Sequence, residues 1–239
     1  MKAIFLKNYK LYLMEALGLA IFMISACFFT AMMEHLTTTW HHAFPEPRTR
    51  LAIVAAAMGL TALFIFYSPF TAPSGAHINP AITLVQLRIG NINRIDAFFY
   101  IIFQFIGGTL AVYMMAFFMG NTLTASPVNY VVTVPVKNVP LLKVAFCEVF
   151  ISFIMVTMIL NTSGSEKLKK YTRLFAAVLV FANVMLAGPI SGFGMNPARS
   201  FASALPAHTW TSFWIYVICP LAGMLGACEI FIAIKKRTL

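Results

Sequence analysis

Two short segments of this chain repeat the same polar residues and could do chemistry on a small ligand. Ser74–Ala81 and Ser191–Ala198 share Ser, Gly, Asn, Pro and Ala in register, and their asparagines, Asn79 and Asn196, lie about half of the 239-residue chain apart. Asparagine is a strong helix N-cap, because its side-chain oxygen accepts a hydrogen bond from the first turn. We therefore expect a short helix after each asparagine, with the amide NH2 left free as a donor toward a lumen.

The neighbouring residues fit the same interpretation. Pro80 and Pro197 suit the first helical position, where a missing N–H costs nothing. Ala81 and Ala198 are small enough to let the two helix ends abut. The segments before the asparagines, including Phe193, are expected to run extended and to present a ladder of carbonyl acceptors. The residues of this ladder are Gly75, Ala76, His77, Gly192 and Gly194.

Three ionisable residues in apolar surroundings are further candidates. Arg199 follows Asn196 by one helical turn, and a cation at membrane depth is a functional candidate because its burial is costly. Its N–H donors could replace the lost hydration of a neutral polar solute. Glu15 and Glu148 are interpreted as carboxylates that brace the adjoining segments by accepting backbone N–H bonds, and the alternative is a proton-coupled transporter. The ring of His77 is expected to brace its segment rather than to bind a metal.

The composition indicates where these residues lie. Hydrophobic residues make up 60% of the chain and charged residues 10%, whereas soluble domains carry about 25% charged residues. This excludes a disordered chain, a disulfide scaffold and an ordinary soluble enzyme. Despite a net charge of +10, the basic residues form short clusters between apolar runs, so we expect a lipid bilayer and no nucleic acid as the partner. We expect no metal and no cofactor.

Six apolar runs are each near the ~20 residues that a membrane-spanning helix needs. They are residues 11–33, 51–67, 97–118, 141–160, 174–186 and 213–234. The two segments Asn79–Leu87 and Asn196–Leu205 are too short to span, because helices of this length reach only about half the hydrocarbon core. We expect two re-entrant half-helices. Backbone that ends at membrane depth is tolerated beside a watery cavity, so a cavity is implied.

The basic residues also indicate orientation. Twelve Lys and Arg residues flank one side of the six runs and four flank the other, which places both termini on the cytoplasmic side of the membrane. We expect a plasma membrane or a bacterial inner membrane. Three spans separate the two repeats, so the second half is inserted upside down. We expect a single channel domain, residues 1–239, with halves of about 1–120 and 136–239. Both half-helix N-termini, each with about half a positive charge, then meet at the midplane and repel cations and protons.

His77–Thr83 and Gly194–Ser200 resemble the two signature loops of the aquaporin, or major intrinsic protein, family. Other residues fall where the family places its helix landmarks, namely Glu15, Gln104, Gly107, Glu148, Gly188 and Pro220. The resemblance covers essentially the whole chain. It implies an all-α integral membrane protein with six tilted helices, two half-helices, a pore in each subunit and a homotetramer.

The resemblance also implies a selectivity filter of four residues, which are Met58 (or Gly59), Val184, Phe193 and Arg199. In the strict water channels of the family, the residues at these four positions are Phe, His, a small residue and Arg. Here Val replaces His, and Phe replaces the small residue as in glycerol channels. Ser200, Ala204 and the pair Phe213–Trp214, in contrast, resemble water channels.

We therefore expect a passive channel for water. The alternative is a channel for small neutral solutes such as glycerol, urea or ammonia. An inverted-repeat secondary transporter is a third interpretation, but we expect only two membrane carboxylates and no full-length span that Pro or Gly residues break. An enzyme is disfavoured, because neither a G-x-S-x-G nor an H-E-x-x-H motif occurs.

Overall fold

The computed structural model describes residues 1–237, and six of the helices in this part are long and apolar enough to cross a membrane. They are α1 (Lys2–Glu34), α3 (Pro47–Tyr67), α5 (Arg94–Met119), α7 (Leu141–Ser163), α8 (Thr172–Ser191) and α10 (Ile215–Arg237). Each contains or overlaps one of the predicted apolar runs. The expectation of an all-helical membrane protein is confirmed.

The helices extend beyond the apolar runs at several ends. α1 begins at Lys2 rather than at residue 11, because its first turns carry lysines that form helix well but lower the hydropathy. α8 continues past residue 186 through Pro189 to Ser191, where Gly192 ends it with φ +76°. Hydropathy locates the part of a helix that faces lipid or protein, whereas the helix itself ends where a cap or a turn stops it.

Two further helices are only half as long. α4 (Pro80–Arg88) has nine residues and α9 (Pro197–Ala207) has eleven, so they reach about 14 and 17 Å at a rise of about 1.5 Å per residue. Each starts directly after one of the repeated asparagines, with proline in the first turn. The loops contain the short elements α2 (Thr39–Ala43), η1 (Ala72–Ser74), α6 (Asn121–Thr124), η2 (Asn129–Val131) and η3 (Lys169–Tyr171).

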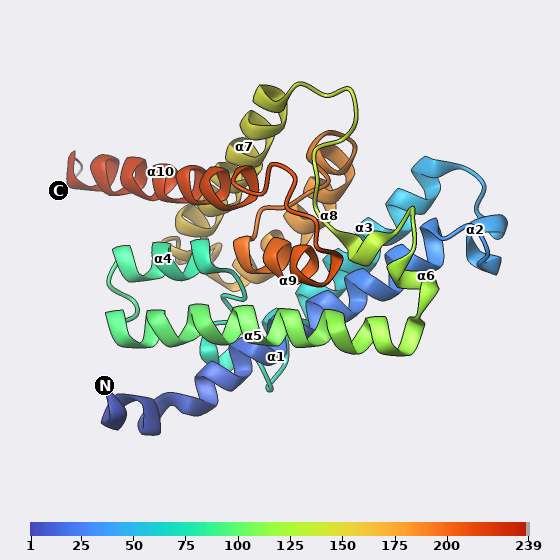
Figure 1. Ribbon diagram of the computed structural model, residues 1–239. Coiled ribbons are helices and arrows are strands. Elements are labelled where there is room, and N and C mark those ends of the chain that lie inside the picture. The colour runs from blue at the N-terminus through green and yellow to red at the C-terminus, as the bar shows by residue number, and fades with distance from the viewer. Residues whose placement is uncertain (238–239) are drawn as a thin grey trace.

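The start of α1 and the end of α10 lie at one end of the bundle, which we call the terminal face (Figure 1). The opposite face carries α2 and α6. α4 packs against α5 and α10 and ends at the terminal face beside the start of α5, whereas α9 packs against α5 and η2. The N-termini of α4 and α9 meet inside the bundle, and the two half-length helices together therefore take the place of one span.

Close helix crossings hold each half together. α1 packs along α5 in the first half, and α7 packs along α10 in the second. A Cβ on Gly107 would lie 2.1 Å from the carbonyl oxygen of Ala16, and a Cβ on Gly223 would lie 2.3 Å from that of Val149. Small residues at such crossings let helix backbones approach closely, which is how membrane helices associate.

We expect Gly107→Ala to destabilise the fold by about 3 kcal/mol or more, because overpacking against rigid backbone cannot be relieved by a side-chain rotation. Gly226→Ala on α10 is the matched control, since a Cβ there meets no atom within 4 Å. The measurement is the thermal unfolding midpoint of each variant in nanodiscs. Equal midpoints for the two variants would contradict the close crossing of α1 and α5.

Candidate functional site

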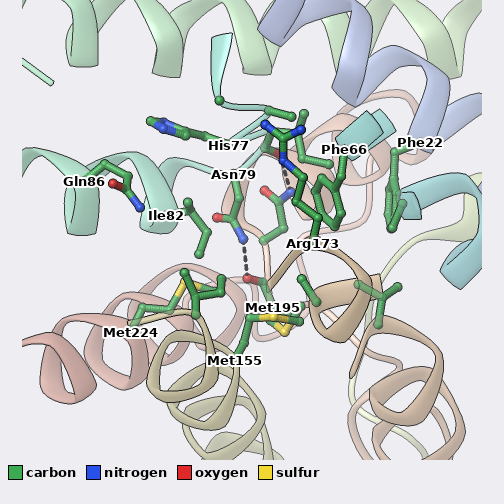
Figure 2. A pocket seen from close by; sticks show the side chains of 18 of the residues that line it. Phe22, Phe66, His77, Asn79, Ile82, Gln86, Met155, Arg173, Met195 and Met224 are labelled. Carbon is green, nitrogen blue, oxygen red and sulfur yellow. Dashed lines mark hydrogen bonds between the residues drawn. The ribbon is translucent and has the colours of Figure 1, made fainter. Parts of the chain in front are cut away.

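A cavity of about 270 Å³ runs from the terminal face to the meeting point of the two half-length helices. We call it the vestibule. Residues of α1, α3, α4, α7, α8 and α10 line it, together with the two loops that precede α4 and α9. Its side chains include Phe22, Phe66, Gln86, Met155, Arg173 and Met224 (Figure 2). Because water occupies about 30 Å³ in the liquid, the vestibule has room for a short file of waters.

The repeated asparagines lie at the inner end of the vestibule and cross-link the two loops. Nδ2 of Asn79 donates to the carbonyl oxygen of Met195 at 2.9 Å (Figure 2), and Nδ2 of Asn196 donates to that of Ile78 at 2.7 Å. The expectation that each NH2 group is wholly free is therefore wrong. The two N-termini abut so closely that each amide reaches the other loop, and each amide keeps one of its two N–H donors for a ligand.

The oxygen of each asparagine amide caps its own helix. Oδ1 of Asn79 accepts from the backbone N–H of Ala81 at 2.9 Å. Oδ1 of Asn196 accepts from the N–H groups of Ala198 and Arg199 at 3.0 and 3.2 Å. With the oxygen held by the helix and one N–H held by the opposite loop, neither amide can rotate without breaking hydrogen bonds.

Glu15 is fully buried and binds the loop before α4. Its carboxylate accepts from Oγ of Ser74 at 2.6 Å, and from the backbone N–H groups of His77 and Ile78 at 2.9 and 2.6 Å. Nε2 of Gln104 donates to the same carboxylate at 2.7 Å. α1 and α5 thus hold this loop through one acidic side chain that satisfies four donors.

Glu148 repeats this arrangement for the loop before α9. It accepts from Oγ of Ser191 at 2.6 Å, and from the N–H groups of Gly194 and Met195 at 2.9 and 2.7 Å. The hydroxyl of Tyr216 donates to the carbonyl oxygen of Ser191, as the hydroxyl of Tyr100 does to that of Ser74 in the first half. The two halves therefore share the serine, backbone N–H and tyrosine contacts, and not only one short sequence.

The loops before the asparagines are not extended, contrary to expectation. Positive φ angles occur at Gly75 (+91°), Ala76 (+48°), Ile78 (+44°), Gly192 (+76°), Phe193 (+57°) and Met195 (+51°). In an extended strand, successive N–H groups point in opposite directions. Here two consecutive N–H groups must reach one carboxylate, so the backbone is left-handed at three of the four residues that precede each asparagine.

His77 is held on both sides. Its Nδ1 lies 3.2 Å from Oγ1 of Thr83, and its ring packs against Tyr100 with centroids 5.1 Å apart. Oγ1 of Thr83 donates to the carbonyl oxygen of Asn79 and accepts from Nε2 of Gln104. Because that hydroxyl proton is already used, the His77 contact places the imidazole proton on Nδ1. The residue that corresponds to His77 in the second loop is Gly194.

The residues expected to form the filter do not all line the vestibule. Phe193 lies at its inner end, whereas Met58, Val184 and Arg199 are buried in the half of the bundle beyond it. A Cβ on Gly59 would lie 3.1 Å from Cβ of Phe181 on α8, so Gly59 serves helix packing and Met58 is left as the α3 candidate. Nη1 of Arg199 has no hydrogen-bond partner within the described residues.

Sequence reasoning missed most of the vestibule. Apolar residues such as Phe22, Phe66 and Met155 are equally typical of helix packing, and Arg173 is one of the twelve basic residues that indicate only orientation. A signal was present on α8, where Arg173, Ala176 and Val180 follow one another at helical spacing on one face. From sequence alone, a helix face that lines a cavity cannot be distinguished from one that packs in the core, because the difference depends on where the neighbouring helices lie.

Comparisons with known proteins agree with this geometry. Residues 3–231 match the family described as Major intrinsic protein. The chain is 33% identical over 165 residues to a probable aquaporin NIP-type of Nicotiana alata, covering 68% of this chain and 58% of that one. It is 30% identical over 221 residues to the probable aquaporin TIP2-2 of Arabidopsis thaliana, covering 90% and 82%. The matched part thus spans about three fifths of the first relative.

The fold is also similar to a solved structure. The X-ray structure of the aquaglyceroporin from Plasmodium falciparum superposes with a TM-score of 0.78, covering 94% of this chain and 95% of that one. The two sequences are 18% identical. At this identity the likeness concerns the fold and not the solute.

Proposed function

Because this chain belongs to the major intrinsic protein family, we propose that it is a passive channel that conducts water and excludes ions and protons. The observation that carries the proposal is the meeting of two helix N-termini at the inner end of the vestibule, with one asparagine amide on each. Helix N-termini carry partial positive charge, and here two of them face the same point.

The proposed mechanism follows from these donors. A water that passes the meeting point accepts hydrogen bonds from the remaining N–H groups of Asn79 and Asn196, since their other polar groups are engaged. Such a water donates away from the centre on both sides, which interrupts proton transfer along the file. A cation is repelled by the paired dipoles, as is typical of pores that exclude charge in this way.

We propose that Met58, Val184, Phe193 and Arg199 form the filter in the half of the pore beyond the vestibule. The chain then forms one channel domain, residues 1–239, with inverted halves of about 1–120 and 136–239. The excess of Lys and Arg places the terminal face in the cytoplasm. We also propose a homotetramer with one pore in each subunit, in a plasma or bacterial inner membrane.

The test is stopped-flow shrinkage of proteoliposomes that contain the purified protein. We expect water permeability well above that of empty liposomes, with an activation energy near that of diffusion in liquid water. Flux that saturates with solute concentration and follows an ion gradient would indicate a transporter. Water permeability equal to that of empty liposomes would contradict the proposal.

A channel for small neutral solutes is the second candidate. The observation in its favour is the apolar wall of the pore, which Phe22, Phe66 and Met155 form in the vestibule and Val184 continues beyond it. The carbon chain of a solute such as glycerol packs against such a wall, while its hydroxyl groups form hydrogen bonds with polar groups on the opposite wall. The same liposomes, tested with glycerol, urea and ammonia, separate this candidate from a strict water channel.

We expect Val184→His to hold water permeability within a few-fold and to suppress any glycerol or ammonia permeability. The imidazole is larger than the isopropyl group and adds a polar group opposite Arg199, so the pore becomes narrower and loses its apolar wall. Val184→Leu is the control, since it adds bulk without a hydrogen bond. A ratio of solute to water permeability that Val184→His leaves unaltered would show that Val184 does not line the filter.

A further inference from the structure

One charged side chain of the vestibule has no part in the mechanism described so far. Arg173, in the first turn of α8, lines the vestibule at the terminal face (Figure 2). Its guanidinium carbon lies 5.7 Å from the ring centroid of Tyr67, at the end of α3. A cation over an aromatic face is attracted by the ring quadrupole, so this contact holds the guanidinium beside the cavity without neutralising its charge.

No carboxylate compensates Arg173 in the part of the chain that the structure describes. The ion pairs found there join Arg50 to Glu34, Arg88 to Glu229 and Lys169 to Glu166. The other polar side chains that line the vestibule are neutral or, for His77, hydrogen bonded through Nδ1 to a hydroxyl. Arg173 therefore gives the vestibule a fixed positive charge at its mouth.

We propose that Arg173 is a specificity-determining residue, which repels cations at the mouth of the vestibule before they reach the asparagine pair. The proposal rests on the proposed function in one respect, that the vestibule is the path of permeation. Arg199 lies beyond the asparagines and Arg173 before them, so the pore would carry a fixed positive charge in each half.

Coulomb's law sets the size of the effect. At a separation of about 10 Å, one unit charge lowers the local concentration of a monovalent cation about 2-fold in bulk water and about 15-fold at the effective dielectric constant of a protein surface. It raises the concentration of a monovalent anion by the same factors. The ratio of anion to cation in the vestibule thus changes by the square of this factor.

This ratio is measurable with charged thiol reagents. Ile159 on α7 lines the vestibule and is partly exposed, so Ile159→Cys in a chain whose four native cysteines are replaced by alanine offers one reactive thiol. The rates of modification by an anionic and a cationic methanethiosulfonate are compared, each relative to its rate with a free thiol in solution. At an ionic strength of about 0.01 M, where screening over about 10 Å is weak, we expect the anionic reagent to be favoured, and Arg173→Gln to lower the ratio of rates about fourfold or more.

Two variants complete the experiment. Arg173→Lys should keep the ratio of rates, because it keeps the charge. Lys170→Gln removes an exposed charge three residues away that does not line the vestibule, and should change the ratio far less. A ratio unaffected by Arg173→Gln, or lowered equally by Lys170→Gln, would overturn the proposal. The reagent rates do not depend on water flux, so a failure here is distinguishable from a failure of the proposed function.

Discussion

Glu148→Gln is expected to lower the free energy of unfolding by about 2–3 kcal/mol, because it leaves a buried donor without an acceptor. The carboxylate accepts from three groups of the loop before α9, the hydroxyl of Ser191 and the N–H groups of Gly194 and Met195. A glutamine has one oxygen. Its NH2 group would face either the two bonds at Oε1 or the N–H of Met195 at Oε2, so a donor meets a donor.

The same substitution should impair the pore. Met195 provides the carbonyl that fixes the amide of Asn79, so a loop released from Glu148 also releases the asparagine of the other half. We expect water permeability per folded protein to fall several-fold, whereas Glu166→Gln, on the exposed loop before α8, should leave it unchanged. The measurements are denaturant unfolding in mixed micelles and stopped-flow shrinkage of proteoliposomes.

A different outcome would favour a transporter. If the wild-type protein accumulated a solute along a pH gradient and Glu148→Gln abolished this uptake, the carboxylate would carry protons rather than brace a loop. The geometry argues against that role, because Glu148 is fully buried and both of its oxygens already accept hydrogen bonds. A carboxylate that exchanges protons needs a path to water.

The spans and the half-length helices could be predicted from sequence, because their signals are local. A run of apolar residues indicates a span, and Asn-Pro predicts a helix start wherever it lies. The cross-link between the asparagine amides and the opposite carbonyls could not be predicted. It depends on a distance between Asn79 and Met195 that arises only when α4 and α9 have packed among the spanning helices.

The backbone of the two loops shows the same limit. Gly75 and Gly192 permitted left-handed conformations, but Ala76, Ile78, Phe193 and Met195 adopt them as well. Residues with a Cβ rarely take such angles unless tertiary contacts impose them. Here the contacts are the buried carboxylates of α1 and α7, which attract consecutive N–H groups from residues far along the chain.

Arg199→Val is expected to leave water permeability within a few-fold of wild type and to raise the leak of cations by about two orders of magnitude. One hydrogen-bond donor contributes little to a file of waters. A cation that passes within about 5 Å of the guanidinium is opposed by about 3 kcal/mol at an effective dielectric constant of about 20, which corresponds to about a hundredfold in rate. The leak is measured as the decay of a potassium gradient across proteoliposomes.

Charge and width must be separated, because valine removes both the cation and most of the side chain. Arg199→Met keeps an unbranched chain without the charge, and Arg199→Lys keeps the charge. If charge forms the barrier, Arg199→Met should leak as Arg199→Val does and Arg199→Lys should not. If the width of the pore forms the barrier, Arg199→Met should hold the potassium gradient as the wild type does. Should all three variants hold the gradient as the wild type does, Arg199 is not the barrier, and exclusion of cations would rest on Arg173 and on the helix N-termini at Asn79 and Asn196.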